Sequence, residues 1–215
     1  MRYINPFNLL DLNIDNLSAI DSSIIKRAKK TLLAEIELNG TDTITHNGIE
    51  ITRSDFLRAI DELDDNDKKE FHFFIYENID LNRFLTSCDL NFFKSFKIES
   101  IYKMPAFIDF ISPYFTYQYE KLLSRNFKDG NLANVKLLLS IKPIVNETHF
   151  ENCYKSTYSV IKETENEIIQ ITTDVNNKRS HFIENNFIGL PELIGAKVNA
   201  IAHLLSVIIE IFKID

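Results

Sequence analysis

The sequence predicts a mainly α-helical protein, and three observations favour this fold class. The 215 residues include only five Gly and five Pro, which are too few for a turn-rich sandwich or barrel. Apolar residues recur along most of the chain at the 3.6-residue helical period. The clearest strand signal is confined to residues 43–52.

The first helices are predicted from their capping residues and their apolar spacing. Asn5 and Pro6 predict a short helix through Leu9 and Leu10, because Asn caps a helix and Pro suits its first position. A longer helix is predicted to open at residues 21–23. Its apolar positions recur on one face, at Ile25, Ala28, Leu32 and Ile36.

The segment TITHNGIEIT, residues 43–52, predicts a small β-hairpin. Two short β-branched runs flank Asn47 and Gly48. This pair suits a type I′ turn, because both central residues of such a turn adopt positive φ.

Helices are predicted for most of the chain after the hairpin. Ser54 is predicted to cap a helix that buries Phe56, Ile60 and Leu63, and the next helix carries Phe71, Phe74 and Ile75. Further on, the sequence predicts short helices with breaks at residues 86–89, 104–105 and 112–113. Later helices are predicted to begin near residues 130 and 146 and at Pro191.

Two domains are predicted: a helical unit at residues 1–78 with hairpin 43–52, and an irregular or solenoid-like helical body at 79–215. The boundary is a soft one within residues 78–98. The segment FKDGNLANVKLLLS, residues 127–140, resembles half of an ankyrin-type repeat. No TPLH motif precedes it and no neighbouring copy follows, so stacked ankyrin repeats are not expected.

Three segments within residues 3–76 together resemble the J-domain, the N-terminal module of Hsp70 co-chaperones. NPFNLLDL resembles its first helix, DSSIIKRAKKTLLAEIEL its second, and FLRAIDELDDNDKKEF its third helix and exit. The resemblance implies a three-helix unit that buries Phe56, Ala59, Ile60 and Leu63, followed by Asp65 as the residue that stops the helix.

The functional tripeptide of the J-domain family does not carry over. J-domains stimulate their ATPase partner through a His-Pro-Asp loop between the second and third helices, and this chain contains no His-Pro pair. Its corresponding connection is the hairpin, where His46 is followed by Asn47 and Gly48. The scaffold is therefore expected without Hsp70 ATPase stimulation.

Four basic residues on the second predicted helix form a candidate contact surface: Lys26, Arg27, Lys29 and Lys30. The resemblance implies a docking face for an acidic partner. The alternative is a solvated helix face beside the chain's own acidic stretch at residues 61–67, where exposed pairs contribute only about 0–1 kcal/mol. The hairpin tip, His46 to Gly48, is a second candidate contact.

The last predicted helix carries its polar residues in one narrow stripe, at Asn199, His203, Ser206 and Glu210. Most of its remaining surface is apolar and must be covered. The chain's own core, a partner or self-association surface, and an in-plane membrane position are the alternatives. The candidate contact ridge is Ile201, Leu205, Ile208, Ile209 and Phe212. The chain ends inside this pattern, which leaves two alternatives: a natural terminus whose last turn frays, or a longer protein whose further helices cover this face. The second is slightly favoured.

Charge and motifs exclude several activities. The net charge of −7 disfavours binding to nucleic acid. Cys88 and Cys153 lack metal-ligand spacing and indicate a reducing compartment, and no signal peptide or membrane span is apparent, so a cytoplasmic location is expected. His149 and Cys153 form an i, i+4 pair without an oxyanion site or orienting third group. We therefore expect no catalytic residues, cofactor or metal.

The sequence thus predicts a non-enzymatic scaffold or adaptor, built on a degenerate J-like module, that binds a protein partner and self-associates, if at all, through its last helix. Two alternatives remain open. One is a nucleic-acid adaptor that uses the basic helix 24–36. The other is an enzyme whose site is assembled from scattered residues.

Overall fold

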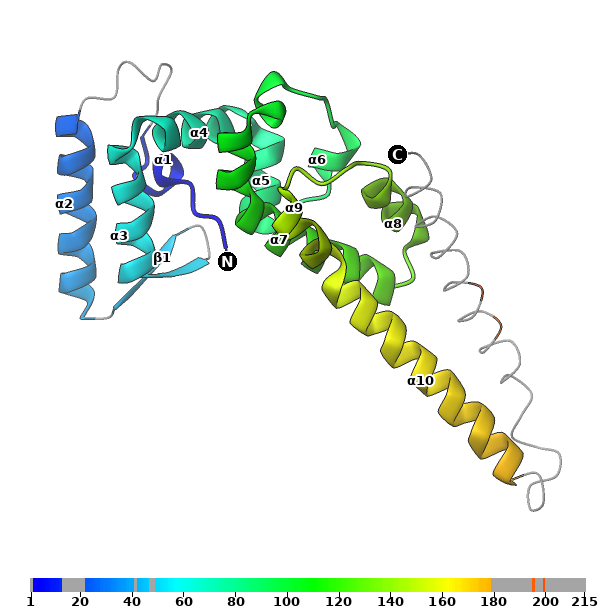
Figure 1. The fold of residues 1–215 in the computed structure, drawn as a ribbon. Helices are drawn as coiled ribbons and strands as arrows, with labels where there is room; N and C mark the ends of the chain where they lie inside the picture. Colours follow the sequence, from blue (N-terminus) through cyan, green and yellow to red (C-terminus); the bar gives the residue numbers. More distant parts are fainter. Residues whose placement is uncertain are drawn as a thin grey trace. The chain divides into compact units, whose positions relative to one another are not determined.

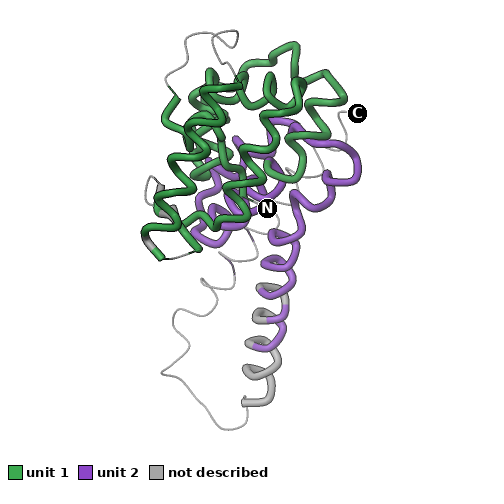
Figure 2. Tube along the Cα trace, turned by 90° about the vertical axis from the view of Figure 1, so that its left-hand side faces the viewer, with its two compact units in different colours: residues 1–114 green, residues 115–215 purple. Residues whose placement is uncertain are grey.

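The computed structural model describes residues 2–12, 22–40, 42–46 and 49–178, with Gly195 and Asn199 as isolated positions (Figure 1). This part of the chain is mainly helical, which confirms the predicted fold class. The chain forms two compact units, residues 1–114 and 115–215 (Figure 2). The boundary expected near residue 78 falls inside the first unit, between two of its helices.

Helix α1, Pro6–Leu9, begins where the sequence predicts it. The Asn5 side chain accepts a hydrogen bond from the Phe7 backbone N–H at 3.0 Å, and Pro6 occupies the first helical position. Proline costs nothing there because the first N–H groups of a helix have no partner within the helix. Although it is short, α1 places Phe7 and Leu9 in the core.

Helix α2, Ser22–Asn39, presents its predicted apolar face to the same core. Ile25 and Ile36 are buried, and Ala28 and Leu32 pack against the cluster while partly buried. The hydrophobic core of this region gathers residues from α1, α2, a hairpin strand and the helical segments that follow: Phe7, Leu9, Leu10, Ile25, Ile36, Ile51, Phe56, Ile60 and Leu63.

Strands β1, Thr43–His46, and β2, Ile49–Thr52, pair antiparallel and confirm the predicted hairpin. The register pairs His46 with Ile49 and Thr43 with Thr52. Ile51 is buried, so one face of the hairpin joins the core.

The cap of helix α3, Arg53–Asp61, differs from the prediction. The capping residue is Thr52 rather than Ser54: the Thr52 hydroxyl accepts a hydrogen bond from the Asp55 backbone N–H at 3.2 Å. The helix starts directly after β2, because Thr52 is the last extended residue. Its hydroxyl is placed to accept from the Asp55 N–H, which has no partner within the helix.

Replacing Thr52 with alanine is expected to destabilise the protein by about 1 kcal/mol, because α3 loses its cap. Thr52→Ser keeps the hydroxyl and is expected to restore most of the stability, which separates the cap from strand propensity. Chemical denaturation measures both variants. Ser54→Ala is the matched control, with an expected change within about 0.5 kcal/mol. A larger loss for Ser54→Ala than for Thr52→Ala would contradict this assignment.

Two ion pairs show that α2 and α3 run antiparallel. Lys29 pairs with Asp61, and Glu37 pairs with Arg53 at 3.7 Å. The partners are eight residues apart on each helix and in opposite order. Three buried residues of α3 contact the core from this position: Phe56, Ala59 and Ile60.

Helix α3 continues into the 3₁₀ turn η2, Glu62–Asp64, and then into α4, Asn66–Glu77. The Asp65 carboxylate caps α4 by accepting hydrogen bonds from the N–H groups of Asp67 and Lys68 at 3.0 and 3.2 Å. The predicted helix carrying Phe71 and Ile75 is thereby confirmed, and both residues are buried.

The first unit is completed by aromatic packing of short elements: α5, Ile79–Ser87; α6, Asn91–Lys94; the 3₁₀ turn η3, Ser100–Lys103; and the first part of α7, Pro105–Lys128. The Phe84 ring stacks on Phe92 and meets Phe93 edge-on, with centroid distances of 5.6 and 4.9 Å. Helix α5 ends at Cys88 in the left-handed conformation (φ 64°), which confirms the predicted break.

The break predicted at residues 112–113 is wrong, because α7 runs through Pro113 without interruption. A proline inside a helix removes one backbone hydrogen bond and costs about 3 kcal/mol. Burial offsets that cost here, since both neighbouring turns carry fully buried side chains: Phe107, Ile111, Phe115, Tyr119 and Leu122.

The second unit contains the rest of α7 with α8, Leu132–Leu139; α9, Glu147–Phe150; the 3₁₀ turn η4, Glu151–Tyr154; and α10, Lys155–Lys178. The Tyr119 hydroxyl donates a hydrogen bond to the Leu138 carbonyl at 3.0 Å, which joins α7 to α8. Caps at Asn131 and Asn146 begin α8 and α9 close to the predicted positions. The ankyrin-like segment 127–140 contributes the end of α7 and all of α8.

Candidate functional site

The basic residues of α2 do not form a single face. Lys26, Arg27 and Lys30 are exposed, whereas Lys29 is turned toward α3 and paired with Asp61. At 3.6 residues per turn, Lys29 lies close to the side on which Ile25 and Ile36 enter the core. This arrangement agrees with a solvated helix face beside the chain's own acidic stretch, and a docking role for the three exposed cations stays a prediction.

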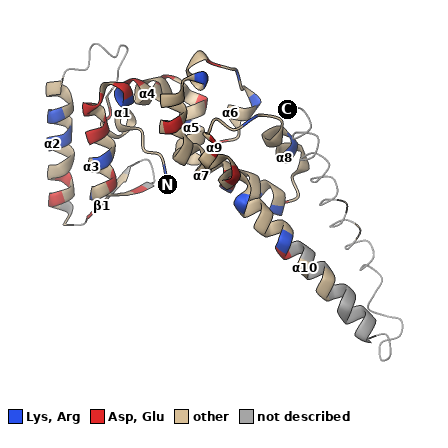
Figure 3. Cartoon of the chain, in the orientation of Figure 1, with Lys and Arg blue, Asp and Glu red and all other residues tan. Residues whose placement is uncertain are grey.

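The charges along α2 run against the helix dipole. The N-terminal half is basic and the C-terminal half is acidic, with Glu35 and Glu37 (Figure 3). The first turn holds no acidic residue and the last turn no basic one, which is the reverse of the arrangement that stabilises an isolated helix. Helix stability thus does not account for where these charges lie.

A groove of about 430 Å³ lies between the end of α1 and one side of α2. Its lining combines apolar side chains with polar and charged ones: Leu9, Leu10, Asp11, Ile24, Arg27, Ala28, Thr31, Leu32 and Glu35. Ile24, one of the apolar lining residues, is 42% exposed. Arg27 belongs to both the groove and the exposed basic residues, so the two features are continuous.

The other sequence-predicted contacts are only partly covered by the structure. The backbone of His46 is described as the last residue of β1, and Asn47 and Gly48 lie outside the described residues. The C-terminal ridge of Ile201, Leu205, Ile208, Ile209 and Phe212 also lies outside them.

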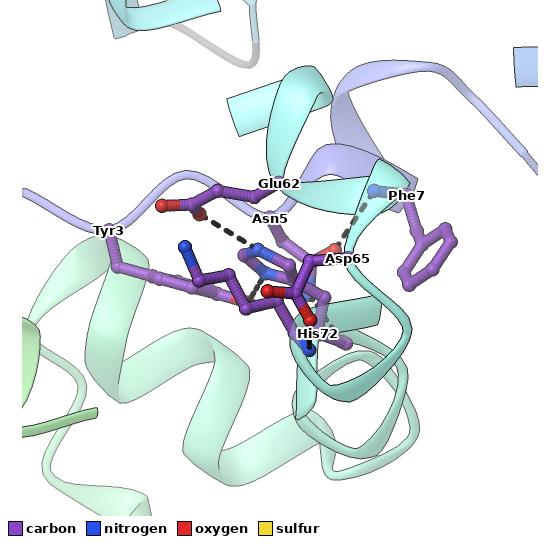
Figure 4. A network of polar contacts seen from close by, with 7 residues as sticks. Tyr3, Asn5, Phe7, Glu62, Asp65 and His72 are labelled. Atoms are coloured by element: carbon purple, nitrogen blue, oxygen red, sulfur yellow. Dashed lines mark hydrogen bonds and ion pairs between the residues drawn. The ribbon is translucent and has the colours of Figure 1, made fainter. Parts of the chain in front are cut away.

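A buried polar network that the sequence does not reveal joins the N-terminal segment to η2 and α4 (Figure 4). The Tyr3 hydroxyl and His72 Nδ1 are 2.8 Å apart, and His72 Nε2 is 3.0 Å from the Glu62 carboxylate. The Asn5 amide donates to the His72 carbonyl at 3.4 Å. Tyr3 and His72 are each 1% exposed.

The surroundings of His72 favour a neutral imidazole. Burial lowers its pKa, and the Glu62 carboxylate opposes that shift only in part. A neutral ring satisfies both partners if Nε2–H donates to Glu62 and Nδ1 accepts from the Tyr3 hydroxyl. Burial also raises the pKa of Tyr3. Burial, helped by the nearby Glu62 carboxylate, raises the pKa of Tyr114 to about 12. Both phenols therefore stay protonated.

The network has the residue types of a proton relay, but its geometry suits a structural role. No substrate reaches a ring that is 1% exposed, and the hydrogen bonds of His72 are already made. The bonds fix the entry of the chain to α1 against α4 across a sequence separation of 69 residues. The partners Tyr3 and Glu62 lie too far from His72 along the chain to be inferred from the sequence.

The His149 and Cys153 pair does not form a nucleophile and base. Cys153 is fully buried, burial raises its pKa to about 11, and its thiol contacts the Thr116 hydroxyl at 3.7 Å. The His149 ring instead hydrogen-bonds to the Asn146 side chain at 2.8 Å. A neutral, buried thiol is a poor nucleophile.

The described part of the chain holds no group of three or more His, Cys, Asp or Glu side chains placed to bind a metal ion. None of the helices described there combines the length and the apolar character that crossing a bilayer requires.

Comparisons with protein-family models, curated proteins and solved structures found no match to this chain. The resemblance of residues 3–76 to a J-domain therefore stays a prediction based on the residues themselves. The exposed side of α2 and its groove, which we call the α2 surface (Ile24, Lys26, Arg27, Lys30 and the groove residues), remain as the candidate site.

Proposed function

We propose that this chain is a non-enzymatic adaptor that binds an acidic, amphipathic segment of a partner protein through the α2 surface. One observation carries the proposal: exposed cations of α2 adjoin an open groove that is lined in part by apolar side chains. Such a pair of features suits a helix that lays an apolar face into the groove and directs Asp or Glu toward the basic side.

The exposed cations of α2 support this proposal because they contribute little to the stability of the folded chain. Among the described ion pairs, none involves Lys26, Arg27 or Lys30. Their place near the N-terminus of α2 does not stabilise the helix through its dipole. Opposite charge on a partner would speed association and set its orientation, while apolar contacts in the groove would supply affinity.

The packing around α2 is compatible with a degenerate J-like module. Helices α2 and α3 run antiparallel, and α1 packs against the same core. The connection between α2 and α3 is the hairpin, in the place of the His-Pro-Asp loop. The proposed adaptor is accordingly expected to bind its partner without stimulating Hsp70 ATPase activity.

Nucleic-acid binding through the same helix receives less support. Glu35 lies in the groove and Glu37 pairs with Arg53, so the C-terminal half of α2 presents acidic groups to a phosphate backbone. Lys29 is already paired with Asp61. Three exposed cations on a chain of net charge −7 provide little of the electrostatic energy on which phosphate binding depends.

The proposal is tested by reversing the exposed charges of α2 in the triple variant Lys26→Glu, Arg27→Glu, Lys30→Glu. Affinity capture from the native host is expected to lose specific partners about tenfold or more, because attraction becomes repulsion. Lys94→Glu, Lys128→Glu, Lys136→Glu is the matched control, since it changes the net charge equally at three exposed lysines elsewhere. Equal recovery of the same partners by both baits would overturn the proposal.

A second variant tests the groove separately from the charge. Ile24→Gln removes an exposed aliphatic side chain from the groove lining and leaves every cation in place. It is expected to weaken capture of the partners that the charge reversal loses. The nucleic-acid alternative would be favoured if the wild-type bait captured nucleic acid at low salt only, and if charge reversal abolished this capture while Ile24→Gln did not.

A further inference from the structure

A second pocket lies in the first unit, away from the α2 surface. Its volume is about 210 Å³, and it is formed by the start of α5, the end of α6 and the loop into η3. It shares no residue with the α2 groove. The lining residues are Asn78, Asp80, Phe92, Ser95, Phe96, Lys97, Glu99 and Tyr102.

Three aromatic rings form part of the wall of this pocket. Phe92 meets Phe96 edge-on, with a centroid distance of 5.5 Å and an interplanar angle of 85°. Phe96 lies nearly parallel to Tyr102, at 6.1 Å and 13°. The Asn78 amide donates a hydrogen bond to the Tyr102 hydroxyl at 3.3 Å and so holds that ring in place. The faces of such rings carry negative potential and attract cations.

The charged groups of the pocket are two carboxylates and one ammonium. Asp80 is held by a 2.5 Å hydrogen bond from the Ser95 hydroxyl, which fixes it at the pocket wall. Glu99 lies close enough to Tyr102 to add to the effect of burial in raising the pKa of its hydroxyl. With Lys97 opposing them, Asp80 and Glu99 leave the lining with an excess of negative charge.

The start of α5 does not turn the pocket into an anion site. A helix N-terminus attracts anions when its N–H groups are unpaired, but the Asn78 side chain already accepts the hydrogen bond of the Leu81 N–H at 3.0 Å. Asp80 occupies the first turn and its carboxylate would repel an incoming anion.

We propose that this pocket binds the alkylammonium group of a lysine side chain presented by a peptide. The ammonium enters between Phe96, Asp80 and Glu99. Lys97 weakens this binding by repulsion. The pocket is independent of the proposed α2 surface and is tested separately.

The test is an NMR titration of the full chain with n-butylammonium chloride, which reproduces the end of a lysine side chain, and with 1-pentanol as its neutral counterpart. Saturable shifts at the pocket residues are expected with the ammonium and not with the alcohol. Equal shifts with both probes, or no saturable shift with about 50 mM ammonium, would overturn the proposal.

Two exposed side chains decide the sign of the charge that the pocket prefers. Glu99→Gln is expected to weaken n-butylammonium binding about threefold and Lys97→Gln to strengthen it about threefold, as for partly solvated ion pairs. Opposite changes would show an anion site. Glu70→Gln and Lys128→Gln are matched controls at exposed positions outside the pocket and are expected to leave affinity unchanged.

Phe96→Leu tests the aromatic wall. Leucine preserves apolar bulk and removes the negative ring face, so affinity for n-butylammonium is expected to fall about threefold. Unchanged shifts outside the pocket establish that this variant is folded. Unaltered affinity in a folded Phe96→Leu protein would contradict the role of the ring.

Discussion

Replacing Phe7 with alanine is expected to destabilise the first unit by about 3–5 kcal/mol, the cost typical of a large cavity in a packed core. Phe7 is 0% exposed and belongs to the cluster that unites α1, α2 and α3. Its ring meets Phe73 and Tyr76 of α4 edge-on, at centroid distances of 6.1 and 5.9 Å. One side chain thus contributes to the packing of four helices.

Denaturant unfolding followed by circular dichroism measures this loss as a change in the unfolding midpoint at constant slope. Phe7→Leu retains most of the volume and is expected to cost clearly less than Phe7→Ala. Ile98→Ala, at a site 73% exposed, is the surface control and is expected to stay within about 0.5 kcal/mol. A cost below about 1 kcal/mol for Phe7→Ala would mean that α1 adds little to the core.

Local patterns predicted several features whose deciding contacts are local. The Asn5 cap, the hairpin at 43–52 and the break at Cys88 all depend on residues a few positions apart. The cap of α3 is also a local feature, but it was predicted wrongly: Thr52 and Ser54 can both cap a helix, and the length of β2 decides between them. The error at Pro113 has another cause: the burial that keeps α7 continuous comes from distant segments of the chain.

The candidate sites also combine features that local sequence shows with features that depend on distant residues. The cations of α2 are apparent in the sequence, but which of them face solvent depends on Asp61 of α3, 32 residues beyond Lys29. The Tyr3, Glu62 and His72 network and the aromatic pocket combine residues from several elements without a regular spacing. Only the folded arrangement brings them together.

Acidification is expected to weaken the folded state through His72. Its pKa lies below the ordinary value of 6.5 when the chain is folded, chiefly because the ring is buried. Below pH 6.5 the unfolded chain therefore binds a proton that the folded chain does not, and stability falls as the pH drops toward the folded pKa. One such proton contributes a slope of at most about 1.4 kcal/mol per pH unit.

His72→Gln isolates this effect from the carboxylates that also titrate. At neutral pH the variant is expected to be about 1–3 kcal/mol less stable, because the buried Tyr3 hydroxyl loses its partner while glutamine still reaches toward Glu62. Since glutamine does not titrate, the difference between the two proteins should narrow steadily as the pH falls below 6.5. Tyr3→Phe keeps the histidine and should keep the pH-dependent slope. A difference between wild type and His72→Gln that stays constant from neutral to acidic pH would show that His72 does not couple protonation to folding, and the Tyr3, His72 and Glu62 contacts would then act through packing alone.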